Sequence, residues 1–551
     1  MQNLDYLVFF VYFIIVSAYG LYVYKKKKHE DSKDYFLAKD SLTWWAIGAS
    51  LIASNISAEQ FIGMSGSGFT MGLAIAAYEW LAAITLIVVA VFFIPIYLKN
   101  KIYTMPQFLK TRYNDTVAMI MAVFWLLLYI VVNLTSILFL GALAISSISG
   151  LDFGFCMMAL AVFAVVITLG GMNVIGYTDV IQVVFLILGG LVTTYLALDL
   201  VAEHYGSSGA LNGFNLMTEN SADHFKMIFK KDDPYYMDLP GLAVLVGGMW
   251  IVNLNYWGCN QYITQRALGA DLQTARSGIL FAAFLKLLMP VIVVLPGIAA
   301  FVLYKEGVFS TEMTLNGEVM ADRAYPVLLN LLPVGLKGLS FAALTAAVVA
   351  SLAGKANSIA TIFTLDIYKK KINPAASEEK QVQVGRIVII LSMIMAVAIA
   401  PYLGIDKKGG FQYIQEYTGF VSPGIFAMFI LGFFWKKTTS NAALFATIGG
   451  FVLSVLFKIS PDYIDLEFLY ASGYAIPNAD GVYEIPFIDR MGFVFLICVM
   501  LMFFISIYEN RNGVKPKGLE VDSNMFKPTA AFTVGALIVI GFVAAMYGIY
   551  W

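Results

Sequence analysis

The feature that most constrains this chain is a series of apolar stretches, each roughly 20 residues long, that recur from one end of the sequence to the other. A stretch of this length can cross a bilayer as a helix. Lipid offers no hydrogen bonds, so the backbone must satisfy its own donors and acceptors. Only 13% of the 551 residues are charged and 60% are hydrophobic, which excludes an ordinary soluble protein. The sequence therefore predicts an all-α polytopic membrane protein.

The predicted spans are about fourteen in number, at residues 4–24, 43–68, 71–98, 117–148, 152–171, 176–202, 240–267, 276–304, 335–366, 384–404, 411–435, 440–457, 491–509 and 529–550. An even number places both termini on one side. Basic residues mark cytoplasmic loops. Under this topology such loops hold Lys25 to Lys28, Lys369 to Lys371 and Lys436 to Lys437, together with Arg266 and Arg276. We therefore expect both termini to lie outside.

Two of these spans are interrupted by polar residues and glycines, at residues 53–68 and 247–262. Polar groups inside a span must face protein, water or a ligand. Glycine- and serine-interrupted helices are typical of transporter binding sites. The two broken spans are second and seventh in order, five spans apart. This spacing predicts a core of two five-helix repeats with inverted orientation.

The repeats divide the chain into five predicted segments. These are an extra N-terminal span with a basic inner loop (1–42), the first repeat (43–202), an outer loop (203–239), the second repeat (240–435) and three additional spans (436–551).

Ionisable and amide side chains inside the spans are candidates for function, because burying them in a membrane is costly. Glu79 is either part of a salt bridge or an acceptor for a polyhydroxylated ligand, and Lys286 could pair with such a carboxylate. Gln415 lies among aromatic rings in residues 411–417, a combination that suits a sugar. Asp179 is either an N-cap or part of a cytoplasmic ion path.

A second unusual pair is Ser351 and Lys355, which lie four residues apart and so share one face of the ninth predicted span. A hydroxyl one turn from an ammonium group inside a membrane is unusual, and the residues alone leave its meaning open.

Other functional classes are excluded. The net charge of −1 does not indicate a basic surface that would bind nucleic acid. The three cysteines lack the spacing of a metal site, and we expect them to be packing residues; they are Cys156, Cys259 and Cys498. No P-loop, His-Glu-x-x-His or Cys-x-x-Cys motif occurs, so we expect neither an enzyme nor an ATP-driven pump, and no organic cofactor.

Long stretches resemble the solute:sodium symporter family, most closely its bacterial sodium/galactose (sodium/glucose-type) members. They are residues 53–68, 78–80, 260–262, 281–300 and 411–419, continuing to 435–439, and the resemblance is strongest over residues 35–440. It implies fourteen spans with a leucine-transporter-type core.

The resemblance also implies roles for residues of this chain. Sugar would contact Asn55, Gln60, Glu79, Asn253, Lys286 and Gln415. The outer gate would be Met64, Tyr78 and Phe411, and the inner gate Tyr256. Sodium would bind backbone oxygens of Ala53, Ile56 and Ala347 and the hydroxyl of Ser351.

The chain departs from the family pattern at the ion site. Ala350 stands where the family has a second serine, and Lys355 adds a cation one turn away. Like charges in a low dielectric repel each other. Three outcomes stay open: sodium coupling with Lys355 clear of the site, sodium-independent transport with Lys355 in it, or proton coupling through Lys355. Ala82 replaces a serine that touches the sugar in the family, which weakens the prediction of galactose more than that of a hexose.

These observations predict a secondary-active, sodium-coupled hexose symporter that works by alternating access, embedded in the lipid bilayer of a bacterial inner membrane. A membrane sugar sensor is the alternative from another class. The absence of a recognisable signalling domain argues against it.

Overall fold

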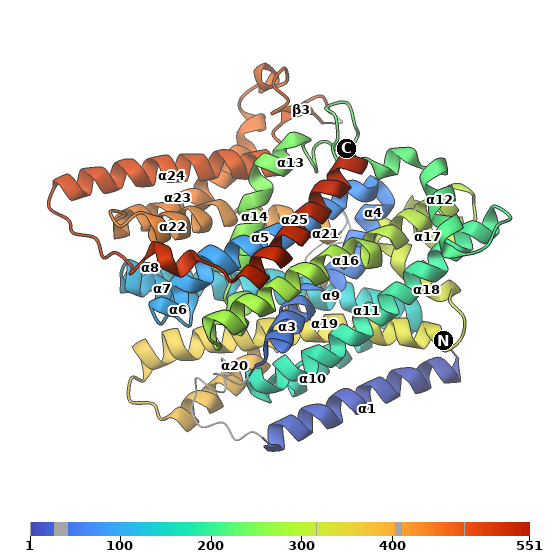
Figure 1. The fold of residues 1–551 in the computed structure, drawn as a ribbon, viewed down its shortest axis with the longest axis horizontal. Coiled ribbons are helices and arrows are strands. Elements are labelled where there is room, and N and C mark those ends of the chain that lie inside the picture. Colours follow the sequence, from blue (N-terminus) through green and yellow to red (C-terminus); the bar gives the residue numbers. More distant parts are fainter. Residues whose placement is uncertain (1, 27–41, 316, 403–409, 479) are drawn as a thin grey trace. The chain divides into compact units, whose positions relative to one another are not determined.

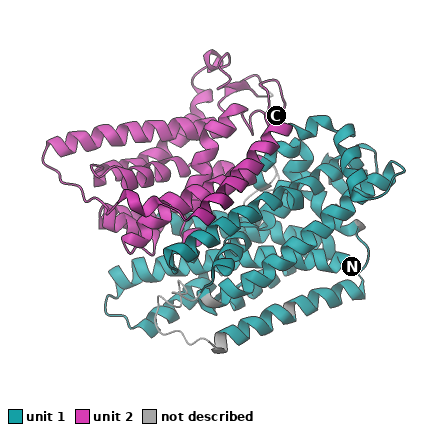
Figure 2. Ribbon diagram, in the orientation of Figure 1, with its two compact units in different colours: residues 1–76, 124–226, 265–414 teal, residues 77–123, 227–264, 415–551 magenta. Residues whose placement is uncertain are grey.

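The computed structural model describes residues 2–26, 42–315, 317–402, 410–478 and 480–551, and it is mostly helical (Figure 1). Packing divides the chain into two compact units (Figure 2). Unit 1 comprises residues 1–76, 124–226 and 265–414, and unit 2 comprises residues 77–123, 227–264 and 415–551. These units follow contacts rather than sequence repeats, so the predicted repeat boundaries stay a prediction. Lys27 and Lys28 of the predicted basic loop lie outside the described residues.

Unit 1 contains α1 (Asn3–Lys26), α3 (Trp44–Asn55), η1 (Glu59–Met64), α4 (Ser65–Met71), η2 (Gly72–Ala76), η4 (Leu128–Leu134), α9 (Thr135–Ser149), α10 (Phe153–Thr168), α11 (Gly171–His204), α12 (Ala210–Asn220), η5 (Ala222–Phe225), α16 (Leu272–Lys305), α17 (Ser310–Met313), η6 (Ala321–Arg323), α18 (Ala324–Leu331), α19 (Leu336–Thr361), η7 (Ile362–Ile372), α20 (Glu378–Ile399) and η8 (Ala400–Tyr402). Strands β1 (Thr314–Leu315) and β2 (Glu318–Val319) form an antiparallel hairpin in this unit.

Unit 2 contains α5 (Ala77–Val88), η3 (Val89–Phe93), α6 (Ile94–Lys99), α7 (Met105–Arg112), α13 (Leu242–Val246), α14 (Gly248–Cys259), α22 (Ser422–Phe434), α23 (Ser440–Ile459), η10 (Ser460–Asp462), η11 (Glu467–Leu469), α24 (Phe487–Arg511), η12 (Ser523–Phe526) and α25 (Ala530–Ile549). Strands β3 (Ile476–Pro477) and β4 (Tyr483–Glu484) pair antiparallel. The chain passes between units within α8 (Asp115–Leu127), α15 (Gln261–Leu268) and α21 (Gly410–Gly419).

The prediction of a helical membrane protein is confirmed by the length and composition of its helices. Among the described residues, ten helical stretches are long and apolar enough to cross a membrane, and α10 and α22 are shorter apolar helices. The count of fourteen spans stays a prediction.

Helix α19 is the centre of unit 1. It is rich in alanine and other small residues and is buried almost throughout. Small side chains let neighbouring helices approach closely. It packs against α1, α3, α9, α10, α11 and α20.

Both spans predicted to be broken are broken. The first is interrupted after α3, where Ile56 has extended backbone angles (φ −81°, ψ 112°) before helix resumes at Glu59. The second is interrupted at Gly247 and again at Asn260 (φ −97°, ψ 129°). Whether the two belong to inverted repeats stays a prediction.

The connection between α12 and unit 2 contains His224, in η5, which covers the end of the first broken span. Its Nε2 donates to the carbonyl oxygen of Phe69 (3.0 Å), and its ring stacks on Phe301 with centroids 3.8 Å apart. Burial lowers the pKa of His224 below its ordinary value of 6.5; the Phe69 hydrogen bond and Asp223 oppose this shift, and Lys305 adds to it.

Acidification should therefore weaken this contact. The folded protein binds the His224 proton less tightly than the unfolded chain does. The contribution of neutral His224 to stability is therefore fully present above pH 6.5 and is lost as the pH falls below that value. We expect the melting temperature to fall more between pH 7.5 and pH 5.5 in the native protein than in a His224→Gln variant. An identical fall in both would show that His224 does not carry the effect.

Candidate functional site

The oxygens predicted to bind a cation lie where α3 ends against α19 in unit 1. Ala53 and Ile56 flank the end of α3, Ala347 and Ser351 lie inside α19, and all four are fully buried. The Ser351 hydroxyl donates to the backbone oxygen of Ser54 (3.0 Å). The structure therefore brings these four residues to one junction between the broken span and the central helix.

The break changes the hydrogen bonding of two of these carbonyls. In a continuous helix the Ser57 amide would donate to Ala53 and the Gln60 amide to Ile56. Here the Ser57 amide donates to Oε1 of Gln60 (3.0 Å), and the Gln60 amide donates to the Ser57 carbonyl (3.1 Å). The Ala53 and Ile56 oxygens thus lose their helical donors. Hard cations prefer oxygen ligands, and carbonyls at a helix end supply them.

A buried ion pair lies beside this junction. Arg266 and Asp179 are at most 1% exposed, and their side chains are 3.8 Å apart. Ser50 donates to Asp179 (2.5 Å) and accepts from Arg266 Nε (2.8 Å), while Arg266 Nη2 donates to the hydroxyl of Ser54. The two serines are one turn apart on α3, so one face of this helix binds both charges.

Two expectations about this pair are wrong. Arg266 does not lie in a loop; it lies in helix α15, and its side chain is completely buried. Asp179 is not an N-cap, because α11 begins at Gly171, two turns earlier. The ion-path role of Asp179 stays a prediction. The sequence signal that could have revealed Arg266 was the pair Ser50 and Ser54, whose hydroxyls on one helix face require partners inside the bundle.

Lys355 lies on α19 directly after Gly354, which packs against Arg266 and Ser54. A Cβ atom at Gly354 would sit 2.5 Å from Arg266 Nη2 and 2.9 Å from the Ser54 hydroxyl, so a larger residue there would have to displace these side chains. Lys355 is 2% exposed. Its ammonium group interacts electrostatically with the carboxylate of Glu59, at the start of η1. The structure therefore places Lys355 in the protein interior, with an opposite charge on the broken span.

Three residues of the predicted sugar site lie in unit 1. Lys286, 1% exposed on α16, donates through its ammonium group to Oδ1 of Asn55 at the end of α3. Gln60 is 6% exposed and accepts from the Ser57 amide, as described above. Asn55 and Lys286 are therefore brought together, and Gln60 lies one turn beyond the break.

The other three lie in unit 2. Glu79 is on α5 and 3% exposed, and Asn253 is on α14, a helix that packs against α5. Gln415 is on α21. Asn253 donates to the Met249 carbonyl (3.1 Å). The assembly of these residues with those of unit 1 into one sugar site stays a prediction.

The predicted gates are also divided between the units. In unit 1, Met64 is the last residue of η1. Phe411 packs against Gly63, the residue before Met64, since a Cβ at Gly63 would lie 2.7 Å from the Phe411 amide nitrogen. In unit 2, Tyr78 is on α5, and Tyr256 on α14 has its ring edge-on to those of Trp257 and Tyr262. Their gating roles stay a prediction.

Comparisons with known proteins agree on one family. The family model described as the sodium:solute symporter family matches residues 35–450. The chain is 46% identical to the sodium/glucose cotransporter of Vibrio parahaemolyticus, an alignment that covers 100% of this chain and 98% of that protein. It is 33% identical to the sodium/myo-inositol cotransporter 2 of Homo sapiens, over 88% of this chain and 72% of that protein.

The fold has a solved counterpart. The substrate-bound outward-open structure of a Na+-coupled sialic acid symporter aligns with a TM-score of 0.76 at 22% identity, covering 94% of this chain and 100% of that one. At this identity the similarity shows a shared fold.

Proposed function

Because this chain belongs to the sodium:solute symporter family, we propose that it is a secondary-active, sodium-coupled hexose symporter that works by alternating access. It is a transporter by family and not an enzyme. The observation that carries the proposal is the junction of α3 and α19, where two carbonyls without helical donors lie beside the Ser351 hydroxyl. These are ligands for an alkali cation.

A hexose is the proposed cargo because of the groups near the breaks. Lys286 and Asn55 in unit 1, and Glu79 and Asn253 in unit 2, are buried polar side chains that can bind several hydroxyls. The two relatives named above are a glucose and a myo-inositol cotransporter, both acting on rings that carry many hydroxyls.

The function is tested by uptake of radiolabelled glucose and galactose into proteoliposomes, with and without an inward sodium gradient at fixed pH. Stimulation by sodium supports the proposal. Uptake of neither sugar under any gradient contradicts hexose transport, and binding without counterflow would indicate a sensor.

Glu79→Ala and Gln415→Ala test the sugar site. Losing a hydrogen bond from the Glu79 carboxylate or the Gln415 amide to substrate should lower uptake by about tenfold or more. Glu203→Ala removes an exposed carboxylate at the end of α11 and serves as the control. Native uptake by both site variants would show that the site is wrongly assigned.

One observation favours a second candidate, sodium-independent or proton-coupled hexose transport. Lys355 places a cation in the interior near the proposed sodium ligands, and Ala350 supplies no hydroxyl. Uptake that responds to a pH gradient but not to sodium would decide for the second candidate.

A further inference from the structure

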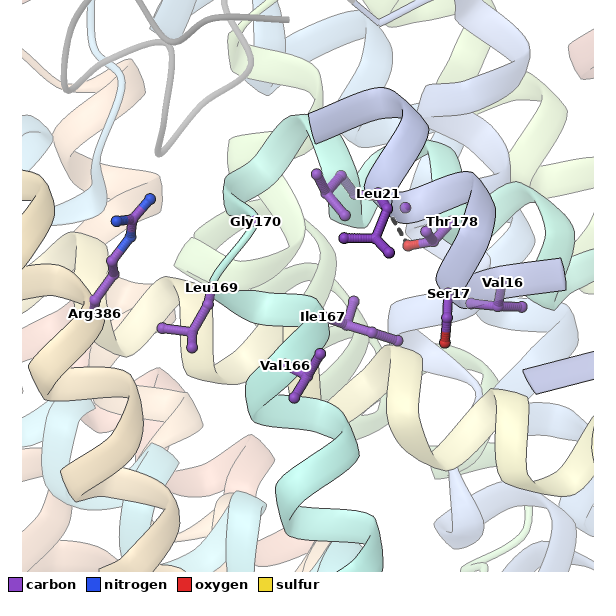
Figure 3. A pocket seen from close by; sticks show the side chains of 11 residues that line it. Val16, Ser17, Leu21, Val166, Ile167, Leu169, Gly170, Thr178 and Arg386 are labelled. Carbon is purple, nitrogen blue, oxygen red and sulfur yellow. Dashed lines mark hydrogen bonds between the residues drawn. The ribbon is translucent and has the colours of Figure 1, made fainter. Parts of the chain in front are cut away.

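A cavity of about 370 Å³ lies in unit 1 between α1, α10, α11 and α20. Figure 3 shows the side chains that surround it. Its walls are mostly aliphatic and include Leu21, Val166, Ile167 and Leu169, while the guanidinium of Arg386 supplies a charge from α20. Walls of this kind suit a hydrocarbon chain and not a sugar or a hydrated ion.

A second cavity, of about 260 Å³, continues along α10 and α20. It is lined only by apolar side chains and shares Val166 with the first. Its α20 residues include Ile390, Ile394 and Val397. Together with Arg386, they recur at intervals of three or four residues and form one stripe of α20.

The stripe has the length of one leaflet. From Arg386 to Val397 the helix rises about 16 Å at 1.5 Å per residue. Half of a hydrocarbon core that is roughly 30 Å thick is about 15 Å. The two cavities form one groove between α10 and α20. Val162 on α10 and Ile394 on α20 line this groove and are 58% and 60% exposed in a chain that spans the membrane. The groove is therefore open to the bilayer along one leaflet.

The charge identifies the leaflet and the lipid class. Arg386 is near the N-terminal end of α20, the end preceded by Lys369 to Lys371. The predicted topology makes this end cytoplasmic. Anionic lipids are attracted to basic residues at that surface, and basic pockets between membrane helices bind their headgroups.

We propose that the groove between α10 and α20 binds an anionic phospholipid of the cytoplasmic leaflet, with an acyl chain along Val166, Ile390 and Ile394 and the phosphate on Arg386. This site is separate from the proposed sugar and cation residues. It adds a lipid ligand that the transport function by itself does not require.

Native mass spectrometry of the full-length protein tests the proposal, with phosphatidylglycerol and phosphatidylcholine of identical chains added in turn. The native protein should retain more phosphatidylglycerol. Arg386→Ala should reduce this preference about fivefold, the effect of roughly one basic contact. Lys380→Ala removes an exposed charge from the same end of α20 and should not change it.

A second variant tests the acyl chain. Val166→Phe fills the groove where the two cavities meet and should reduce the binding of both lipids. A phosphatidylglycerol preference that survives Arg386→Ala, or falls equally with Lys380→Ala, would overturn the headgroup assignment. Unchanged lipid occupancy in Val166→Phe would overturn the groove as the site.

Discussion

Arg266→Met should destabilise the protein by about 3–5 kcal/mol, the usual effect of removing one partner of a buried ion pair. The substitution leaves the Asp179 carboxylate in the interior without its cation and takes a donor from both Ser50 and Ser54. Because these serines are on α3, we expect the broken span to loosen and uptake to fall with stability.

Thermal unfolding in detergent measures this effect, followed by a thiol-reactive dye that reports exposure of Cys156, Cys259 and Cys498, all buried in the folded protein. Arg511→Met, at the exposed end of α24, should stay within about 0.5 kcal/mol of the native protein. The double variant Arg266→Met/Asp179→Asn should recover part of the loss. An Arg266→Met protein as stable as the Arg511→Met control would show that the pair is dispensable.

Ser351→Ala should raise the sodium concentration that gives half-maximal uptake by at least about tenfold. The hydroxyl is the one side-chain oxygen proposed for the cation, and a contact with a charge is worth about 1.5–3 kcal/mol. Sugar affinity at saturating sodium should change little. Initial uptake rates over a sodium series measure both quantities.

Two further variants make this experiment specific. Ser358→Ala removes an equally buried hydroxyl from the same helix, one that donates to the Gly354 carbonyl (3.0 Å), and should behave like the native protein. Ala350→Ser restores the hydroxyl that the family resemblance expects and should lower the sodium requirement. Equal behaviour of Ser351→Ala and Ser358→Ala would remove Ser351 from the cation site.

Local chemistry made the helical membrane fold and its two interruptions predictable. Polar residues such as Asn55 and Gln60 inside an apolar stretch have no partner in lipid, so a break was expected, and the backbone is extended at Ile56. Asn253 and Asn260 gave the same signal in the second broken span, where the backbone is extended at Asn260.

Long-range pairings were not predictable. Arg266 meets Ser50 across 216 positions of sequence, and Ser351 meets Ser54 across 297. Hydropathy assigns a charged residue near a span end to a loop, and Arg266 was misplaced for that reason. The structure locates three predicted sugar residues in unit 1 and three in unit 2. Local sequence patterns do not predict which residues from distant parts of the chain form one site.

The side chain of Gln60 could couple the binding of sugar to the binding of the cation. Its Oε1 accepts from the Ser57 amide, which in a continuous helix would donate to the Ala53 carbonyl, so this rotamer of Gln60 stabilises the break that leaves the proposed cation ligand without its helical donor. A solute that touches the same amide group would favour or oppose this rotamer directly. Under the proposed function, sugar and ion would then be coupled through the hydrogen bond between Gln60 and Ser57. Each would raise the affinity for the other by the same factor.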